Sequence, residues 1–197
     1  MALIGAGMVT TAGLIVLSGR VNRRKTSRLD GDARKLFPRR RRRATRAAAE
    51  LIQPLGKWYG QMPISAAAAA LVWRVRGPRA AAPIAAASAA AASLAWLFEQ
   101  TMKPRKPPPG RHSPTEPAFP SGHALQTSAA ALAIAHVLVR EGANAGVVIP
   151  VALALPIVSG LAKLYLDKHW LTDVLGGYLA GAAIGVSAAA AYELAAQ

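Results

Sequence analysis

The 197-residue sequence contains no cysteine, which excludes a disulfide framework and any metal site built from thiolates. Acidic residues are also scarce, because 9 Asp and Glu stand against 24 Lys and Arg and leave a formal net charge of +15. No internal repeat or separate second domain is visible along the chain. The first apolar stretch lacks the preceding basic residues and the small-residue cleavage site of a secretory signal, so we expect it to be retained as a membrane span.

Long uncharged stretches are the main feature that is present, and hydrophobic residues make up 53% of the chain. Several stretches approach the ~20 residues that a helix needs to cross a bilayer. The sequence therefore predicts an all-α, polytopic membrane bundle of about six transmembrane helices, with a soluble alanine-rich bundle as the alternative. The second stretch is the weakest candidate, because it is short and Arg74 and Arg76 follow it. The six stretches are 2–18, 59–73, 81–96, 124–139, 147–166 and 174–194.

Positive charge is concentrated in one part of the chain, where residues 20–57 hold fourteen of the 24 Lys and Arg. Such a block is typical of a segment that lies against anionic lipid headgroups. We expect no nucleic-acid partner, because neither interleaved aromatics nor a nucleic-acid module accompanies the charges. Within the block, residues 44–56 predict a short amphipathic helix on the membrane surface, with Leu51 and Ile52 on its apolar side. The chain thus divides into an N-terminal span (1–19), a basic juxtamembrane segment (20–58) and a core (59–197).

Polar residues outside the basic block gather in two loops. Residues 103–123 contain six prolines before the sequence Pro-Ser-Gly-His, which rules out a continuous helix. Residues 163–173 connect the last two predicted spans. If successive spans alternate in direction, both loops emerge on the same face of the membrane. Their histidines and lysines are then expected to meet.

The sequence Pro-Ser-Gly-His at 120–123 predicts an anion site. Ser121 precedes the fourth span, so we expect it to be the N-cap of that helix, with free backbone N–H groups at Gly122 and His123. The helix dipole and these donors favour a phosphate oxygen, and glycine lets the backbone approach it closely. His123 would then lie beside the bound anion. For these residues alone, a simple cap with an interfacial histidine is the alternative.

The second loop supports the anion site. His169 and Asp173 are four residues apart, near enough for the carboxylate to hold one imidazole N–H and leave the other nitrogen as a nucleophile or base. Lys163 can offer a cation to the same anion. Two histidines, a carboxylate, cations and a helix N-terminus are the groups that phosphoryl transfer requires.

These two motifs also carry a resemblance. Pro-Ser-Gly-His at 120–123 and the spacing Lys-x5-His-x3-Asp at 163–173 resemble the second and third motifs of the type 2 phosphatidic acid phosphatase superfamily. The resemblance covers the chain from about residue 60 and implies a haloperoxidase-like phosphatase core. It implies a lipid phosphate substrate: phosphatidic acid, phosphatidylglycerol phosphate, a polyprenyl phosphate or pyrophosphate, or a polyprenyl-linked phosphosugar.

The resemblance assigns roles to the residues of both motifs. It implies that His169 is the nucleophile that forms a phosphohistidine and that Asp173 orients it. His123 would be the acid for the leaving group, and Ser121 and Gly122 would bind phosphate. No metal and no cofactor is implied.

Three departures from the family pattern stand out. Ala162 occupies the place of the third motif's serine, and Lys163 replaces its arginine, which exchanges a planar fork for a point charge. The first motif, Lys-x6-Arg-Pro, is not intact, so Lys103, Arg105 and Lys106 are candidate phosphate-binding residues without a one-to-one assignment. A non-catalytic lipid-phosphate-binding protein of the same fold is therefore the alternative function. A soluble haloperoxidase is disfavoured by the spans and would need vanadate.

Two further features lie inside the predicted spans. Gly177, Gly181 and Gly185 recur every four residues in the last span, a spacing that lets helices approach closely and that predicts a face for a homo-oligomer. His136 lies in the fourth span, where an ionisable side chain often marks function. A neutral imidazole bonded to a neighbouring helix is the preferred interpretation.

The distribution of Lys and Arg predicts which face of the membrane carries the polar loops. If all six stretches span, the basic segment and both polar loops share one face of the cell membrane, and the positive-inside rule places that face in the cytoplasm. Many bacterial relatives in the resembled family work on the outer face instead. We favour the cytoplasmic face because the basic block is larger than substrate attraction requires.

Overall fold

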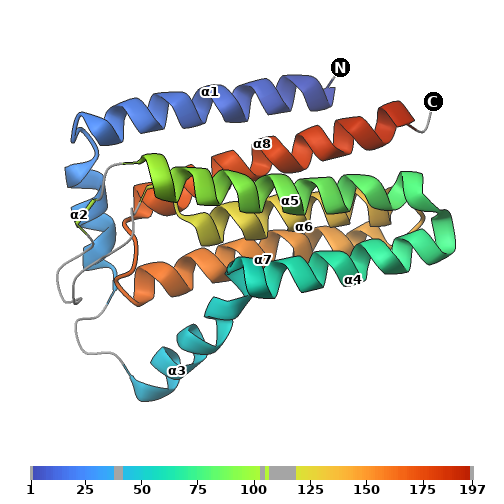
Figure 1. Cartoon of the computed structure of the whole chain (residues 1–197). Helices are drawn as coiled ribbons and strands as arrows, with labels where there is room; N and C mark the ends of the chain where they lie inside the picture. Colours follow the sequence, from blue (N-terminus) through green and yellow to red (C-terminus); the bar gives the residue numbers. More distant parts are fainter. Residues whose placement is uncertain (1, 38–41, 103–104, 107–118, 196–197) are drawn as a thin grey trace.

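A computed structural model of the chain describes residues 2–37, 42–102, 105–106 and 119–195. Within these ranges the regular elements are eight α-helices and one 3-10 turn, and Figure 1 shows the long helices side by side in one bundle, with both termini at the same end. The elements are α1 (Ala2–Asn22), α2 (Ser27–Lys35), α3 (Arg43–Ile52), the 3-10 turn η1 (Gln53–Gly56), α4 (Trp58–Arg76), α5 (Pro78–Thr101), α6 (Gly122–Arg140), α7 (Ala145–Tyr165) and α8 (Leu171–Ala195).

Five of these helices, α1, α5, α6, α7 and α8, are long and apolar enough to cross a membrane. The chain therefore has a multi-pass, all-α fold. The second predicted stretch, 59–73, forms α4, which contains Gln61 and ends in Arg74 and Arg76, and it is not among the five. α4 nevertheless lies alongside α5 in the bundle (Figure 1). The predicted count of about six is thus five by length and composition.

The core of the bundle is α6, which contacts α4, α5, α7 and α8. In α6, 61% of the apolar 18-residue stretch is buried inside the bundle, whereas in α1 none of the corresponding stretch is buried (0%). α1 packs along α8 only with part of its surface, and its exposed side chains include Met8 and Val9. An apolar helix with so little buried surface is suited to contact with lipid.

The glycines at every fourth position of α8 face α6 of the same chain. A Cβ atom at Gly177 would clash with the carbonyl oxygen of Ser121, the N-cap of α6. One at Gly181 would clash with the Leu125 carbonyl oxygen, and one at Gly185 would lie 2.7 Å from Leu132 Cβ. The predicted close helix approach is therefore confirmed. This face is covered by α6 of the same chain, so it is not free for a second copy, and oligomerisation itself stays a prediction.

The basic segment folds over one end of the bundle and does not lie wholly against lipid. The predicted helix over 44–56 is present as α3 followed by η1, with Leu51 80% exposed and Ile52 partly buried. In α2, Arg34 donates to Asp167 at 3.0 Å, between its Nη2 and the carboxylate Oδ2. Arg28, whose side chain is 97% exposed, remains available to anionic headgroups.

Candidate active site

The candidate residues meet where α6 begins and where α7 passes into α8. The Ser121 N–H donates to the Asp173 carbonyl oxygen at 2.8 Å, so the two stretches are in direct contact. This end of the bundle also carries α2, α3 and η1 (Figure 1). The described parts of the two polar loops, 119–123 and 163–173, therefore lie together, as the alternation of the spans predicts.

Ser121 occupies the N-cap position of α6, as predicted, but its hydroxyl does not cap the helix. The side chain is fully buried, and the hydroxyl has no hydrogen-bond partner in the described part of the chain. Burying an unpaired polar group costs about 1–3 kcal/mol. An anion that accepted this O–H at the helix N-terminus would recover that cost. At Gly122 an added Cβ would lie 3.5 Å from Ala95 Cβ, an ordinary van der Waals contact, so the packing of α6 on α5 does not itself require glycine there.

His123 lies in the first turn of α6 and is packed against η1. A Cβ atom at Gly56 would lie 2.8 Å from His123 Cδ2 and 3.0 Å from Ser159 Oγ, so only glycine fits there. The buried Nε2 atom of His123 has no hydrogen-bond partner among the described residues. The lysines that act on this imidazole electrostatically are Lys163, Lys57 and Lys168, and His169 acts on it as well.

His169 and Asp173 are close but not hydrogen-bonded. His169 Nδ1 lies 3.7 Å from Asp173 Oδ2, which is beyond hydrogen-bonding distance. Asp173 is fully buried, and its Oδ2 instead accepts from the Trp170 N–H at 2.8 Å, in the manner of a capping box at the start of α8. Catalytic hydrogen bonds are often long without substrate and shorten in the substrate complex. The geometry is therefore compatible with the expected orienting role of Asp173.

Arg105 is the first-motif candidate that reaches the site. Its guanidinium bridges two buried carboxylates, with Nη1 at 2.6 Å from Asp173 Oδ1 and Nη2 at 2.5 Å from Asp30 Oδ2. It also lies over the Trp170 ring, 5.6 Å from the centroid, and Trp170 Nε1 donates to the Lys106 carbonyl oxygen at 2.8 Å. The backbone of Lys106 therefore lies near the site. Lys103 lies outside the described residues.

Asp30 is a component of the site that the sequence analysis missed. It belongs to α2, and its carboxylate accepts from the Thr172 N–H and from the Thr172 hydroxyl, both at 2.9 Å. Asp30 therefore supplies the start of α8 with a cap from a distant segment and neutralises part of the Arg105 charge. The available signal was an acidic residue inside a block that is otherwise strongly basic.

The lysine that replaces the third motif's arginine is deeply buried. Lys163 is 3% exposed, and its ammonium group donates to Gln53 Oε1 of η1 at 2.9 Å. Lys168 donates to the same oxygen. Two cations from the α7 end of the site therefore converge on one side chain of η1.

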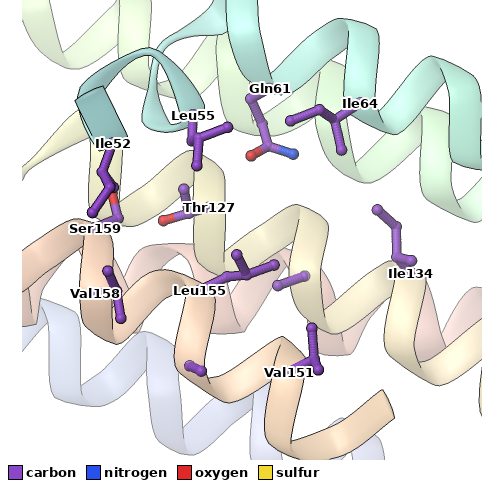
Figure 2. A pocket seen from close by; sticks show the side chains of 12 residues that line it. Ile52, Leu55, Gln61, Ile64, Thr127, Ile134, Val151, Leu155, Val158 and Ser159 are labelled. Carbon is purple, nitrogen blue, oxygen red and sulfur yellow. The ribbon is translucent and has the colours of Figure 1, made fainter. Parts of the chain in front are cut away.

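An apolar cavity of about 260 Å³ adjoins the site. Figure 2 shows it between α4, α6 and α7, with Ser159 and Thr127 near one end and Ile134 toward the other. Thr127 donates to the His123 carbonyl oxygen at 2.7 Å, and Ser159 adjoins the same Gly56 position as His123. The cavity thus begins beside the candidate acid and runs along the bundle.

A metal site is not evident in the described ranges, because they hold no group of three or more His, Asp or Glu side chains placed to bind an ion. Arg105 bridges the two carboxylates of the site, Asp30 and Asp173, and the other groups there are cations, imidazoles, a hydroxyl and backbone donors. This donor set suits an anionic ligand. Independence from a metal stays a prediction.

Comparison with known proteins was made with both sequence and fold. A sequence model of the PAP2 superfamily matches residues 62–195. "Phosphatidylglycerophosphatase B" of Bacillus subtilis (strain 168) is 32% identical over 68 residues, which are 32% of this chain and 34% of the relative. The aligned stretch therefore spans about a third of that protein. The crystal structure of the first transmembrane PAP2 type phosphatidylglycerolphosphate phosphatase from Bacillus subtilis has the same fold, with a TM-score of 0.82 over 93% of this chain and 94% of that chain at 19% identity.

Proposed function

Because the chain belongs to the PAP2 superfamily, we propose that it is an integral membrane phosphatase that hydrolyses a lipid phosphate monoester or pyrophosphate through a phosphohistidine intermediate. The observation that carries the proposal is the 2.8 Å bond between the Ser121 N–H and the Asp173 carbonyl oxygen. This bond joins the two motif-bearing stretches, so that His123 and His169 belong to one buried, cation-rich site.

The first chemical step is transfer of the phosphoryl group to His169. Its Nδ1 faces Asp173, so Nε2 is the nitrogen that attacks phosphorus. The N–P bond forms as the P–O bond to the lipid breaks, and His123 gives its proton to the leaving oxygen. Lys163, the Ser121 hydroxyl and the N-terminus of α6 stabilise the charge on the three equatorial oxygens.

The second step returns the enzyme to its starting state. A water molecule attacks the phosphohistidine, His123 accepts a proton from that water, and the N–P bond breaks. Inorganic phosphate is released and both imidazoles regain their original protonation. The proposed reaction consumes one water for each lipid phosphate and needs no metal.

The substrate is proposed to place one hydrocarbon chain in the cavity of Figure 2. The cavity is lined almost entirely by apolar side chains, including Leu55, Ile64 and Leu155, and it begins beside His123. An acyl or prenyl chain that enters the cavity exchanges one apolar environment for another, so the cavity would orient the chain by shape and van der Waals contact. Phosphatidic acid, phosphatidylglycerol phosphate, polyprenyl phosphate or pyrophosphate, and polyprenyl phosphosugars all satisfy these requirements.

Release of inorganic phosphate from this lipid panel in detergent tests the function. We expect at least one lipid to be hydrolysed by the parent protein and His169→Ala to lose activity by about 10³-fold or more, since the covalent step is removed. Quenching the parent during turnover with a denaturant at alkaline pH should trap phosphate on His169, because the N–P bond of a phosphohistidine is stable to base and labile to acid. Equal rates in the parent and the variant would favour the non-catalytic lipid-binding alternative.

The site is proposed to face the cytoplasm, because the described parts of the basic segment, 20–37 and 42–57, fold over the same end of the bundle as the site. The chain has no native cysteine, so single cysteines can report sidedness. Arg28→Cys, at the site end, should resist an impermeant thiol reagent in intact cells, whereas Arg79→Cys, at the α4–α5 connection, should react. The reverse labelling pattern would place the site outside the cell.

A further inference from the structure

Gln53 makes contacts that its position in the sequence does not suggest. It is the first residue of η1 and lies before the 62–195 stretch that matches the family. Its side-chain oxygen accepts from Lys163 Nζ at 2.9 Å and also from Lys168 Nζ. Because both ammonium nitrogens are within hydrogen-bonding distance of one oxygen, they are no more than about 6 Å apart. One neutral amide therefore fixes the spacing of two cations beside His123.

The contact with Gln53 restricts the position of the Lys163 ammonium group, which a lysine side chain does not restrict by itself. Arginine presents a rigid, planar fork to phosphate, whereas lysine is a point charge on a flexible four-carbon stem. A lysine at this place therefore needs another group to hold its ammonium in position. A glutamine oxygen can do so without cancelling the positive charge, which a carboxylate would cancel.

The turn that carries Gln53 is itself held firmly. On one side, Gly56 is packed so closely on His123 and Ser159 that a Cβ atom there would overlap both. On the other side, Gly60 of α4 allows the Pro54 carbonyl to approach the helix, and a Cβ atom there would clash with it. Contacts on both sides restrict the movement of η1, so Gln53 is held in position relative to His123.

We propose that Gln53 is a positioning residue of the phosphate site, which holds Lys163 and Lys168 as a two-cation clamp in place of the family's arginine fork. The proposal rests on the proposed function, because it concerns how that site binds the phosphate group. It assigns a role in phosphate binding to the segment that precedes the family core.

The test compares Gln53→Ala and Gln53→Glu with the parent. The readouts are KM and kcat for a hydrolysed lipid and the inhibition constant of inorganic phosphate, which measures anion binding without turnover. Gln53→Ala should raise KM and the inhibition constant about tenfold, since a hydrogen bond to a charged group is lost, with a smaller change in kcat. Gln53→Glu should raise both further, because its carboxylate neutralises the ammonium that it binds.

Tyr192→Phe is the control. Tyr192 is a buried residue near the end of α8 that lies away from the site, and its hydroxyl donates to Glu141 Oε1 at 2.5 Å. The variant loses one side-chain hydrogen bond and should leave the inhibition constant of phosphate unchanged. Equal effects of Gln53→Ala and Tyr192→Phe on phosphate binding would overturn the proposal.

A rescue experiment separates positioning from general structural damage. In a Lys163→Arg background the guanidinium supplies its own fork, so Gln53→Ala should have little further effect on phosphate binding. If Lys163→Arg does not fold, as judged by gel filtration in detergent, a cycle of Gln53→Ala and Lys168→Met replaces it. The two changes should then be non-additive, and strict additivity would contradict the clamp.

The outcomes also distinguish this proposal from the proposed function. Loss of hydrolysis in His169→Ala together with parent-like behaviour of Gln53→Ala would refute the clamp alone. Absence of hydrolysis in the parent would refute the phosphatase. In that case, calorimetric binding of inorganic phosphate to the parent and to Gln53→Ala still tests the clamp, and equal affinities would refute it.

Discussion

The two ends of α6 carry the same kind of side chain in opposite circumstances. His123, in the first turn, has a buried Nε2 without a partner among the described residues, whereas His136, near the other end, bonds Glu193 Oε1 at 2.9 Å through its Nε2. Glu193 is also paired with Arg140 at 2.8 Å. Buried polar atoms normally have partners. The end of the bundle that leaves them unpaired is therefore the end expected to receive a ligand.

The other polar and charged side chains differ between the two ends of the bundle in the same way. At the far end, Glu141 pairs with Arg76 at 3.1 Å and accepts from the Tyr192 hydroxyl at 2.5 Å, so the polar groups there satisfy one another. At the site end, by contrast, Ser121 joins His123 among the buried groups without a partner in the described ranges. The comparison teaches that the far end is built for stability and the site end for binding.

The largest contrast is expected between the two histidines. His123→Ala should lower kcat by about 10²–10⁴-fold, because a general acid is removed. His136→Ala should leave kcat nearly unchanged, since Glu193 keeps its pair with Arg140. Steady-state hydrolysis of the best lipid of the panel checks both variants. Comparable losses of kcat in both would break the distinction between the two ends.

The sequence predicted side chains that meet at the candidate site but not the residues that support them, and the catalytic roles stay predictions. His123, His169, Asp173 and Lys163 occupy motif positions with fixed local spacing, and the family assignment from these motifs is confirmed. Asp30 could not be found in this way, because its partner Thr172 is 142 residues away. Such a contact depends on how the basic segment folds over the bundle. The charges of that segment alone predicted contact with lipid headgroups.

The helices could also be predicted from the sequence better than the contacts between them. The lengths of the uncharged stretches predicted α1, α5, α6, α7 and α8, because a membrane span depends on the composition of one continuous stretch of sequence. The partner of the glycine face of α8 is not encoded locally, and the spacing fits a second copy as well as α6. Packing within the chain decided between them.

Arginines at the two ends provide a second contrast, in stability. Arg105 is 22% exposed and bridges Asp30 and Asp173, so Arg105→Ala leaves two buried carboxylates without their cation and should cost about 3 kcal/mol. Arg140 is 54% exposed, and Arg140→Ala should cost less than about 1 kcal/mol. Thermal unfolding in detergent measures both. A larger loss for Arg140→Ala would contradict the assignment of Arg105 to a buried network.

A third contrast uses two buried hydroxyls that lack partners in the described ranges, Ser121 and Ser88 of α5. Ser121→Ala should weaken inhibition by inorganic phosphate about tenfold, because a hydrogen bond to a charged ligand is lost. Ser88→Ala lies away from the motifs and should leave that inhibition unchanged. Neither variant should lower thermal stability, since neither loses a hydrogen bond within the protein. Phosphate inhibition unchanged in Ser121→Ala would remove this hydroxyl from the site.

The smallest contrast concerns the glycine face of α8. Gly177→Ala presses on the Ser121 carbonyl oxygen, and Gly185→Ala presses on Leu132 Cβ, so each should cost about 1 kcal/mol of stability after the gain in helix propensity. Only Gly177→Ala displaces the N-terminus of α6, so only it should also weaken phosphate binding. Parallel unfolding and phosphate-inhibition measurements separate the two effects. If Gly185→Ala weakened phosphate binding as much, the two ends of α6 would be mechanically coupled, and the division between a stabilising end and a binding end would fail.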